Sequence, residues 1–146
     1  MKIAKAKSQK PLFIVWKSKY KTGIDIIDEQ HRGLVSLINT FYFHKADASG
    51  DINTFLVPVA DMLKSYAHLY YLTLERLLRQ TAYLGAEEQI ALHKDILRRL
   101  EWEDHLRRSE RDADGLLVYL KDTWNVFLNN PEPDYIRHLK EHYELI

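Results

Sequence analysis

The sequence predicts an all-α protein: an antiparallel up-down four-helix bundle with an N-terminal arm over residues 1–15 and a short C-terminal helix. Two observations predict it. Apolar side chains recur with a period near 3.6 residues, and no stretch alternates as a half-buried strand does. With only five glycines and four prolines in 146 residues, breaks fall at few places, in "ADASGD", "YLGAEE", "RDADG" and "NNPEPD". Amphipathic helices joined by short turns form such a bundle, which we place at residues 16–146.

The first helix is expected over residues 28–44, where Asp28 is a good capping residue. Its inward face is His31, Leu34, Val35, Ile38 and Phe41. The second helix is expected over residues 52–81, and Pro58 suits its first turn. Its inward face is Met62, Tyr66, Tyr70, Leu74 and Leu77.

Three further helices complete the predicted bundle. The third covers residues 86–110, and its inward face is Gln89, His93, Ile96 and Leu100. The fourth covers residues 114–130, with an inward face of Leu116 or Leu117, Leu120, Trp124 and Phe127. The last begins at Asp134, and its inward face is Tyr135, Leu139, Tyr143 and Ile146.

Composition excludes several classes of function. Lys plus Arg and Asp plus Glu both number 21, so the chain carries no net charge that would indicate a nucleic-acid or membrane partner. The absence of cysteine excludes disulfides, thiolate metal sites and thiol catalysis, and it fits a cytoplasmic protein. The apolar run "LFIV" near the N-terminus is too short for a signal peptide or a membrane span.

Two histidines lie on the inward faces of different helices, His31 on the first and His93 on the third. A buried histidine is commonly a hydrogen-bonded core residue, but facing helices of a bundle are also where cofactor sites are built. His138 and His142 are spaced i, i+4, but they flank the apolar stripe and fit a solvated pair. Nothing in the sequence combines a nucleophile with a base, so we predict that the protein is not an enzyme.

The stretch from Trp16 to Asn39, which contains "YKTGIDIIDEQHRGLVSLIN", resembles the opening of the hemerythrins, in particular the single-domain bacterial ones. The resemblance covers nearly the whole chain. It implies the bundle fold, two irons held by histidines and bridging carboxylates, and reversible binding of dioxygen. It places the first ligand histidine at His31, a family tyrosine at Tyr83 and the second histidine of a later pair at His93.

The same alignment puts residues of other types at most of the remaining ligand positions. These positions are occupied by Tyr70, Leu74, Gln89 and Phe127. Glu75 falls on a family glutamate that is not a ligand, and Glu132 falls on a ligand aspartate but lies between Pro131 and Pro133. A one-residue shift of the second helix would offer Tyr71 and Glu75 instead. We reject that shift because it turns Tyr66 and Leu77 away from the core.

We therefore expect no di-iron centre and no required cofactor. Tyr70, Leu74 and Phe127 would fill the volume of the metal, while Gln89, His31, His93 and the Tyr70 hydroxyl would satisfy one another as one buried polar cluster. The alternative is a reduced site for a single iron, formed by His31, His93, Glu132 and Tyr70.

Three functions compete. The first is a non-catalytic binding or interaction module of the hemerythrin fold that has lost its metal, whose partner would be another protein or a second copy of the chain. The second is a binding protein that uses the reduced iron site. The third is dioxygen carriage or sensing, as the resemblance implies, and it requires the missing ligands.

Overall fold

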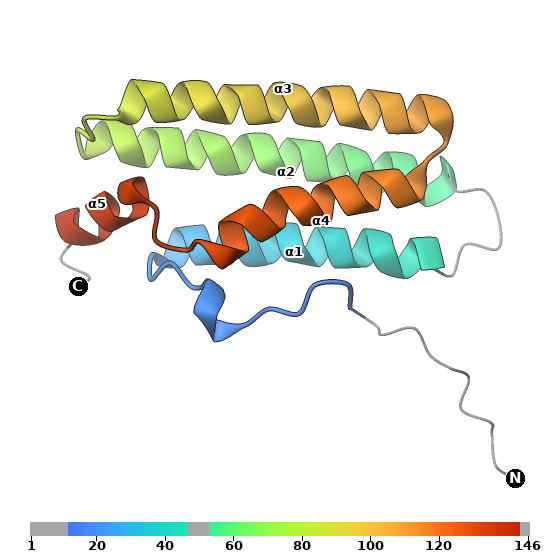
Figure 1. The fold of residues 1–146 in the computed structure, drawn as a ribbon, viewed down its shortest axis with the longest axis horizontal. Coiled ribbons are helices and arrows are strands. Elements are labelled where there is room, and N and C mark those ends of the chain that lie inside the picture. The colour runs from blue at the N-terminus through green and yellow to red at the C-terminus, as the bar shows by residue number, and fades with distance from the viewer. Residues whose placement is uncertain (1–11, 47–52, 144–146) are drawn as a thin grey trace, which may run out of the picture.

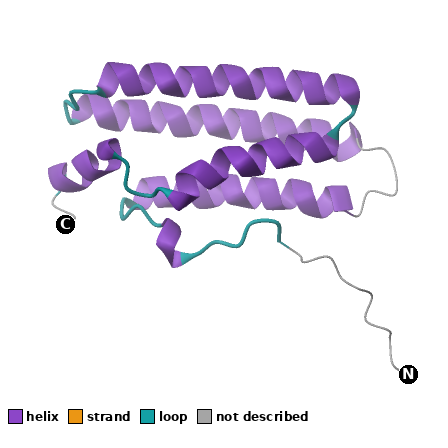
Figure 2. Cartoon of the chain, in the orientation of Figure 1, coloured by secondary structure: helices purple, strands orange, loops and turns teal. Residues whose placement is uncertain are grey.

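Figure 1 shows the computed structural model of the chain, which describes residues 12–46 and 53–143. Its elements are the short 3-10 helix η1 (Ser18–Tyr20) and the helices α1 (Asp25–Ala46), α2 (Asn53–Gln80), α3 (Ala86–Glu110), α4 (Ala113–Asn129) and α5 (Asp134–His142). The described residues are helix, turn or loop and contain no strand (Figure 2). The predicted all-α class is confirmed.

The four long helices form a closed bundle. Helix α1 packs against α2 and α4, and α3 packs against the same two helices. Short turns join α2 to α3 and α3 to α4, so consecutive helices run antiparallel, as Figure 1 shows. Helix α5 packs against α2 at one end of the bundle. The predicted four-helix bundle with a short C-terminal helix is therefore confirmed.

Helix α1 begins at Asp25, three residues before the predicted start. Asp28 is therefore not the N-cap but a residue of the first turn. Its carboxylate accepts hydrogen bonds from the backbone N–H and the hydroxyl of Thr22, both at 2.8 Å, and from the N–H of Gly23 at 3.1 Å. Gly23 has φ +90, a conformation that favours glycine. Asp28 thus stabilises the loop that leads into α1.

The buried face of α2 differs in part from the predicted one. Tyr70 and Leu74 are fully buried as predicted, but Met62 is 57% exposed, and Tyr66 and Leu77 are only partly buried. The buried stripe consists of Ala60, Leu63, Ala67, Tyr70, Tyr71, Leu74 and Leu78. Repeated steps of four, as from Met62 to Leu74 in the predicted stripe, drift around a helix with 3.6 residues per turn, whereas alternating steps of three and four stay on one face.

Two further predictions about helices need correction. Pro58 does not lie in the first turn of α2, since that helix already begins at Asn53 and contains Pro58 in its interior. Tyr143 follows the end of α5 and is exposed, while Tyr135, Ile136 and Leu139 supply that helix's buried face. The predicted inward position of Ile146 lies outside the described residues.

The part of the N-terminal arm that the structure describes packs along α1 (Figure 1). The side chain of Asn39 fixes it: its Oδ1 accepts from the backbone N–H groups of Phe13 and Ile14 at 3.0 and 2.8 Å, and its Nδ2 donates to the carbonyl of Ile14 at 2.8 Å. Ile14 is buried in the core. None of the described helices is long and apolar enough to cross a membrane.

Candidate functional site

Two hydrogen-bonded pairs of side chains, each with one histidine, lie at the centre of the bundle, and the first pair joins α1 to α2. Nε2 of His31 lies 2.6 Å from the hydroxyl oxygen of Tyr70, and both side chains are buried. We assign the hydroxyl as donor, because this distance is shorter than the usual N–H···O range. The imidazole proton then sits on Nδ1, which has no hydrogen-bond partner among the described residues. The ring of Trp124 on α4 packs edge-to-face with both partners, with centroid distances of 6.4 Å to His31 and 5.8 Å to Tyr70.

Burial keeps both members of this pair uncharged at neutral pH. It lowers the pKa of His31 to about 4, and the nearby Asp28 carboxylate opposes the shift only in part. Burial also raises the pKa of the Tyr70 hydroxyl well above its ordinary value. Tyr70 is thus a neutral phenol that donates a hydrogen bond, and His31 is a neutral imidazole that accepts it.

A second pair lies on α3, where the amide nitrogen of Gln89 is 3.0 Å from Nε2 of His93. An amide nitrogen can only donate, so His93 accepts through Nε2 and carries its proton on Nδ1, which again has no partner among the described residues. Burial lowers the pKa of His93 to about 4, against an opposing effect of Glu75. The ring of Tyr71 lies 4.6 Å from the His93 ring, and that of Tyr135 lies 6.0 Å away.

The structure therefore divides the predicted polar cluster into two pairs. The side chains of Tyr70 and Tyr71 link them, with ring centroids 4.9 Å apart. Leu74, one turn further along α2, is fully buried and adds no polar atom. Phe127 belongs to α4, but its side chain lies outside the described part of the structure. The centre is thus a layer of aromatic rings with two neutral imidazoles inside it.

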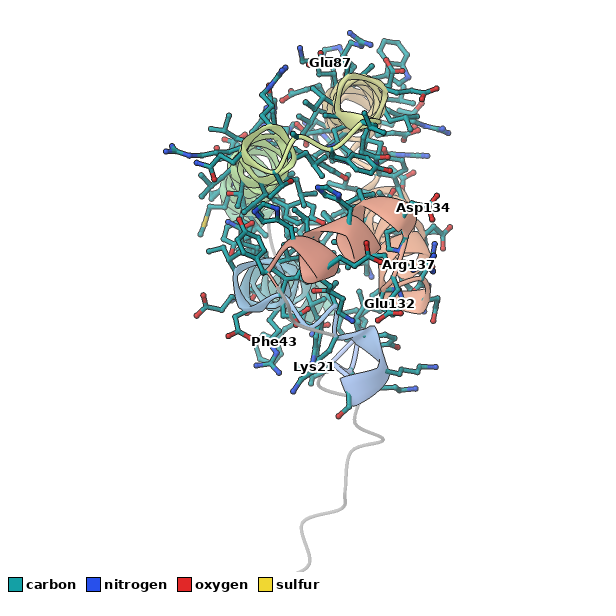
Figure 3. The ribbon with its side chains drawn as sticks, turned by 90° about the vertical axis from the view of Figure 1, so that its left-hand side faces the viewer. Lys21, Phe43, Glu87, Glu132, Asp134 and Arg137 are labelled. Atoms are coloured by element: carbon teal, nitrogen blue, oxygen red, sulfur yellow. The ribbon has the colours of Figure 1, made fainter. Side chains whose placement is uncertain are left out.

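Glu132 is not part of this centre. Its side chain is exposed and forms an ion pair with Lys140, which lowers the pKa of the carboxyl group. Figure 3 shows Glu132 near Asp134 and Arg137, in the segment between α4 and α5. The prolines on both sides disfavour helical geometry there. Of the four residues of the predicted reduced site, the structure brings His31 and Tyr70 into hydrogen-bond contact, places His93 in the same aromatic layer and leaves Glu132 outside.

The chain is similar to curated proteins named bacteriohemerythrin. Those of two strains of Pseudomonas aeruginosa and that of Pseudomonas paraeruginosa are each 25% identical to it over 124 residues, which is 84% of this chain and 79% of theirs. This chain is a distant homologue of the bacteriohemerythrins. No family profile matches it. The hemerythrin-like fold that the motif around His31 implied is thereby supported by the length of the similarity as well as by the helices.

The hemerythrin resemblance implies a di-iron centre, and the residues present do not fit one. No group of three or more His, Cys, Asp or Glu side chains among the described residues is arranged to hold a metal ion. The Nε2 atoms of His31 and His93 are already hydrogen-bonded to Tyr70 and Gln89. A bridging carboxylate is impossible at Leu74, because a hydrocarbon side chain has no donor atom.

Sequence reasoning missed Tyr71 as a member of this layer. It treated Tyr70 and Tyr71 as alternatives, whereas both are buried: Tyr70 contacts His31, and Tyr71 contacts His93. Adjacent residues on a helix are about 100° apart, which a wide buried face accommodates. The signal was present in the sequence, since an aromatic pair next to an apolar stripe indicates a helix that packs on two neighbours.

Proposed function

We propose that this hemerythrin-like chain is a metal-independent bundle that acts as a non-catalytic binding or interaction module, not as a dioxygen carrier. The observation that carries the proposal is the 2.6 Å hydrogen bond between Tyr70 and His31. The hydrogen bond occupies Nε2 of His31, which the hemerythrin resemblance makes the first metal ligand. The phenol ring of Tyr70 stands at a second position where the resemblance implies a ligand. This hydrogen bond joins α1 to α2 directly, so no metal is needed to link these two helices.

Packing at the same centre supports the proposal. Burying a large apolar or aromatic side chain contributes roughly 1.5–3 kcal/mol, so Tyr70 and Leu74 together contribute about 3–6 kcal/mol. That is a large part of the ~5–15 kcal/mol by which a domain is stable. The reduced single-iron site receives less support, since Glu132, its expected carboxylate ligand, pairs with Lys140 on the surface and lies outside the centre that holds the two histidines.

The test is the metal content of protein purified without chelators. We expect iron far below one atom per chain, no visible absorption bands that respond to dioxygen, and an unfolding temperature that chelators do not change. Two irons per chain with bands that respond to dioxygen would overturn the proposal in favour of dioxygen carriage. One firmly held iron per chain, lost in a His31→Gln variant, would favour the reduced site instead. The absence of catalysis and a cytoplasmic location remain predictions.

A further inference from the structure

A groove of about 380 Å³ opens between α2 and α3, which lie side by side along the bundle in Figure 1. Its volume lies within the range of small-molecule sites in proteins. The residues that define it are Tyr71, Leu72, Ile90, His93, Lys94 and Leu97. The groove lies on the outer side of the aromatic layer at the bundle centre, and two of its residues, Tyr71 and His93, belong to that layer.

The lining of this groove is apolar with a buried polar side chain beside it. Leu72 is 61% exposed, although burying a leucine side chain away from water is favourable. His93 is only 3% exposed, and its Nδ1 has no partner among the described residues. An apolar groove with a few polar groups is the usual composition of a small-molecule site.

The charged side chains at the rim of the groove bear on the charge of the ligand. Glu101 has a cationic partner in Lys64, whose Nζ lies 3.3 Å from its carboxylate, and Nε2 of His68 lies 3.4 Å from the same carboxylate. Glu75 pairs with Arg79 at 3.3 Å. Arg98 at the same rim pairs with Asp95. The remaining cation of the lining is Lys94, which has no ion-pair partner among the described residues. Lys94 is therefore the cation of the lining with which the carboxylate of a ligand can pair.

We propose that the groove binds a small apolar carboxylate, with its hydrocarbon body against Leu72 and Leu97 and its carboxylate beside Lys94. A volume of about 380 Å³ is that of a small-molecule site, so we assign the groove to a small molecule and not to a helix of a partner. This inference rests on the proposed function in treating the chain as a binding module, and it names the class of ligand. It does not depend on the absence of metal.

The experiment is a titration of the full chain with 2-naphthoate, followed by backbone amide NMR. We expect saturable shifts confined to residues 68–75 and 90–101. Uncharged 2-naphthamide, which has the same ring system, should bind about two- to fivefold more weakly, because it forms no ion pair. Lys94→Glu should weaken naphthoate binding by about tenfold or more. Leu72→Glu, at an exposed position where folding is retained, should do the same.

The matched control is Lys21→Glu, which makes the same charge reversal on an exposed lysine at the opposite side of the molecule from α3 (Figure 3). It should leave naphthoate binding unchanged. The proposal is overturned by an absence of saturable binding, by shifts that centre on other helices, by equal binding of the amide, or by equal effects of the two lysine variants. Iron is measured in the same sample, so an iron-loaded protein that binds naphthoate refutes the proposed function alone.

Discussion

Lowering the pH from 7 to 5 should destabilise the protein through two buried histidines. His31 and His93 have pKa values of about 4 in the folded chain, against an ordinary value of 6.5 once the chain unfolds. Between these values the unfolded chain binds protons that the folded chain does not, so unfolding becomes more favourable as the pH falls. The contribution of these two histidines to the free energy of unfolding is complete above pH 6.5. It is lost progressively as the pH falls to 4 and changes no further below pH 4.

The size of the effect follows from the same two pKa values. One pKa unit corresponds to 1.36 kcal/mol, so each histidine costs about 2 kcal/mol at pH 5 and about 3 kcal/mol in full. Together they remove about 4 kcal/mol at pH 5, a large part of a typical domain stability of ~5–15 kcal/mol. Because pH 5 lies above the ordinary pKa of carboxyl groups, Asp and Glu contribute little over this interval.

Urea unfolding followed by circular dichroism at several pH values between 7 and 5 measures this loss. His31→Gln and His93→Gln should each remove about half of the pH dependence, and the double variant should remove nearly all of it. His105→Gln changes an exposed histidine on α3 and is the matched control, with an unchanged pH dependence. An unfolding free energy that stays constant from pH 7 to 5, or that falls equally in the double variant, would refute the reasoning.

Three further predictions concern stability at neutral pH. Leu74→Ala should cost about 2–5 kcal/mol in urea unfolding, because Leu74 is fully buried; a loss under about 1 kcal/mol would contradict its place in the core. Tyr70→Phe should cost about 1–3 kcal/mol by leaving Nε2 of His31 without a partner, and adding His31→Leu should recover part of that loss, which a purely steric effect would not allow. Glu132→Ala should change the unfolding free energy by less than about 0.5 kcal/mol, and a larger change would show that the carboxyl group has a buried partner.

The helices could be predicted from the sequence because periodicity and breaks are local properties of the chain. The predicted limits of 86–110 match α3, and the start of α5 at Asp134 is also correct. The start of α1 was missed because an aspartate can stabilise a helix start in two ways. It can cap the helix as its first flanking residue, or it can lie in the first turn and accept from the preceding loop, as Asp28 does with Thr22.

The centre of the bundle was predictable as a set of positions but not as a set of contacts. The alignment brought His31, Tyr70 and Leu74 to the core correctly. Which nitrogen bonds to which partner depends on side-chain rotamers, so the separation of His31 from the His93 pair could not be predicted from spacing. Glu132 shows the opposite case: its spacing along the chain matched a ligand, but the backbone between two prolines does not direct it inward.

The hypothesis of a lost metal site makes one prediction that tests the alignment and the energetics together. Restoring the ligands should restore iron binding at the cost of stability without metal. Each buried polar group without a partner costs about 1–3 kcal/mol, so the new groups at the fully buried positions Tyr70 and Leu74 alone cost roughly 2–6 kcal/mol in the metal-free protein, a large part of the ~5–15 kcal/mol stability of a domain. Iron then recovers the fold, because metal binding free energy becomes folding free energy. The variant combines Tyr70→His, Leu74→Glu, Gln89→His and Phe127→His.

Circular dichroism with and without ferrous iron, together with iron analysis, measures both effects. We expect a variant that is unfolded or loosely packed without iron and that folds with two irons per chain. The matched control keeps Leu74 and changes the other three positions, so it has the histidines but no bridging carboxylate and should hold iron more weakly. A quadruple variant that folds without iron and takes up none would show that these four positions do not surround one site. The predicted alignment of α2, α3 and α4 would then be wrong.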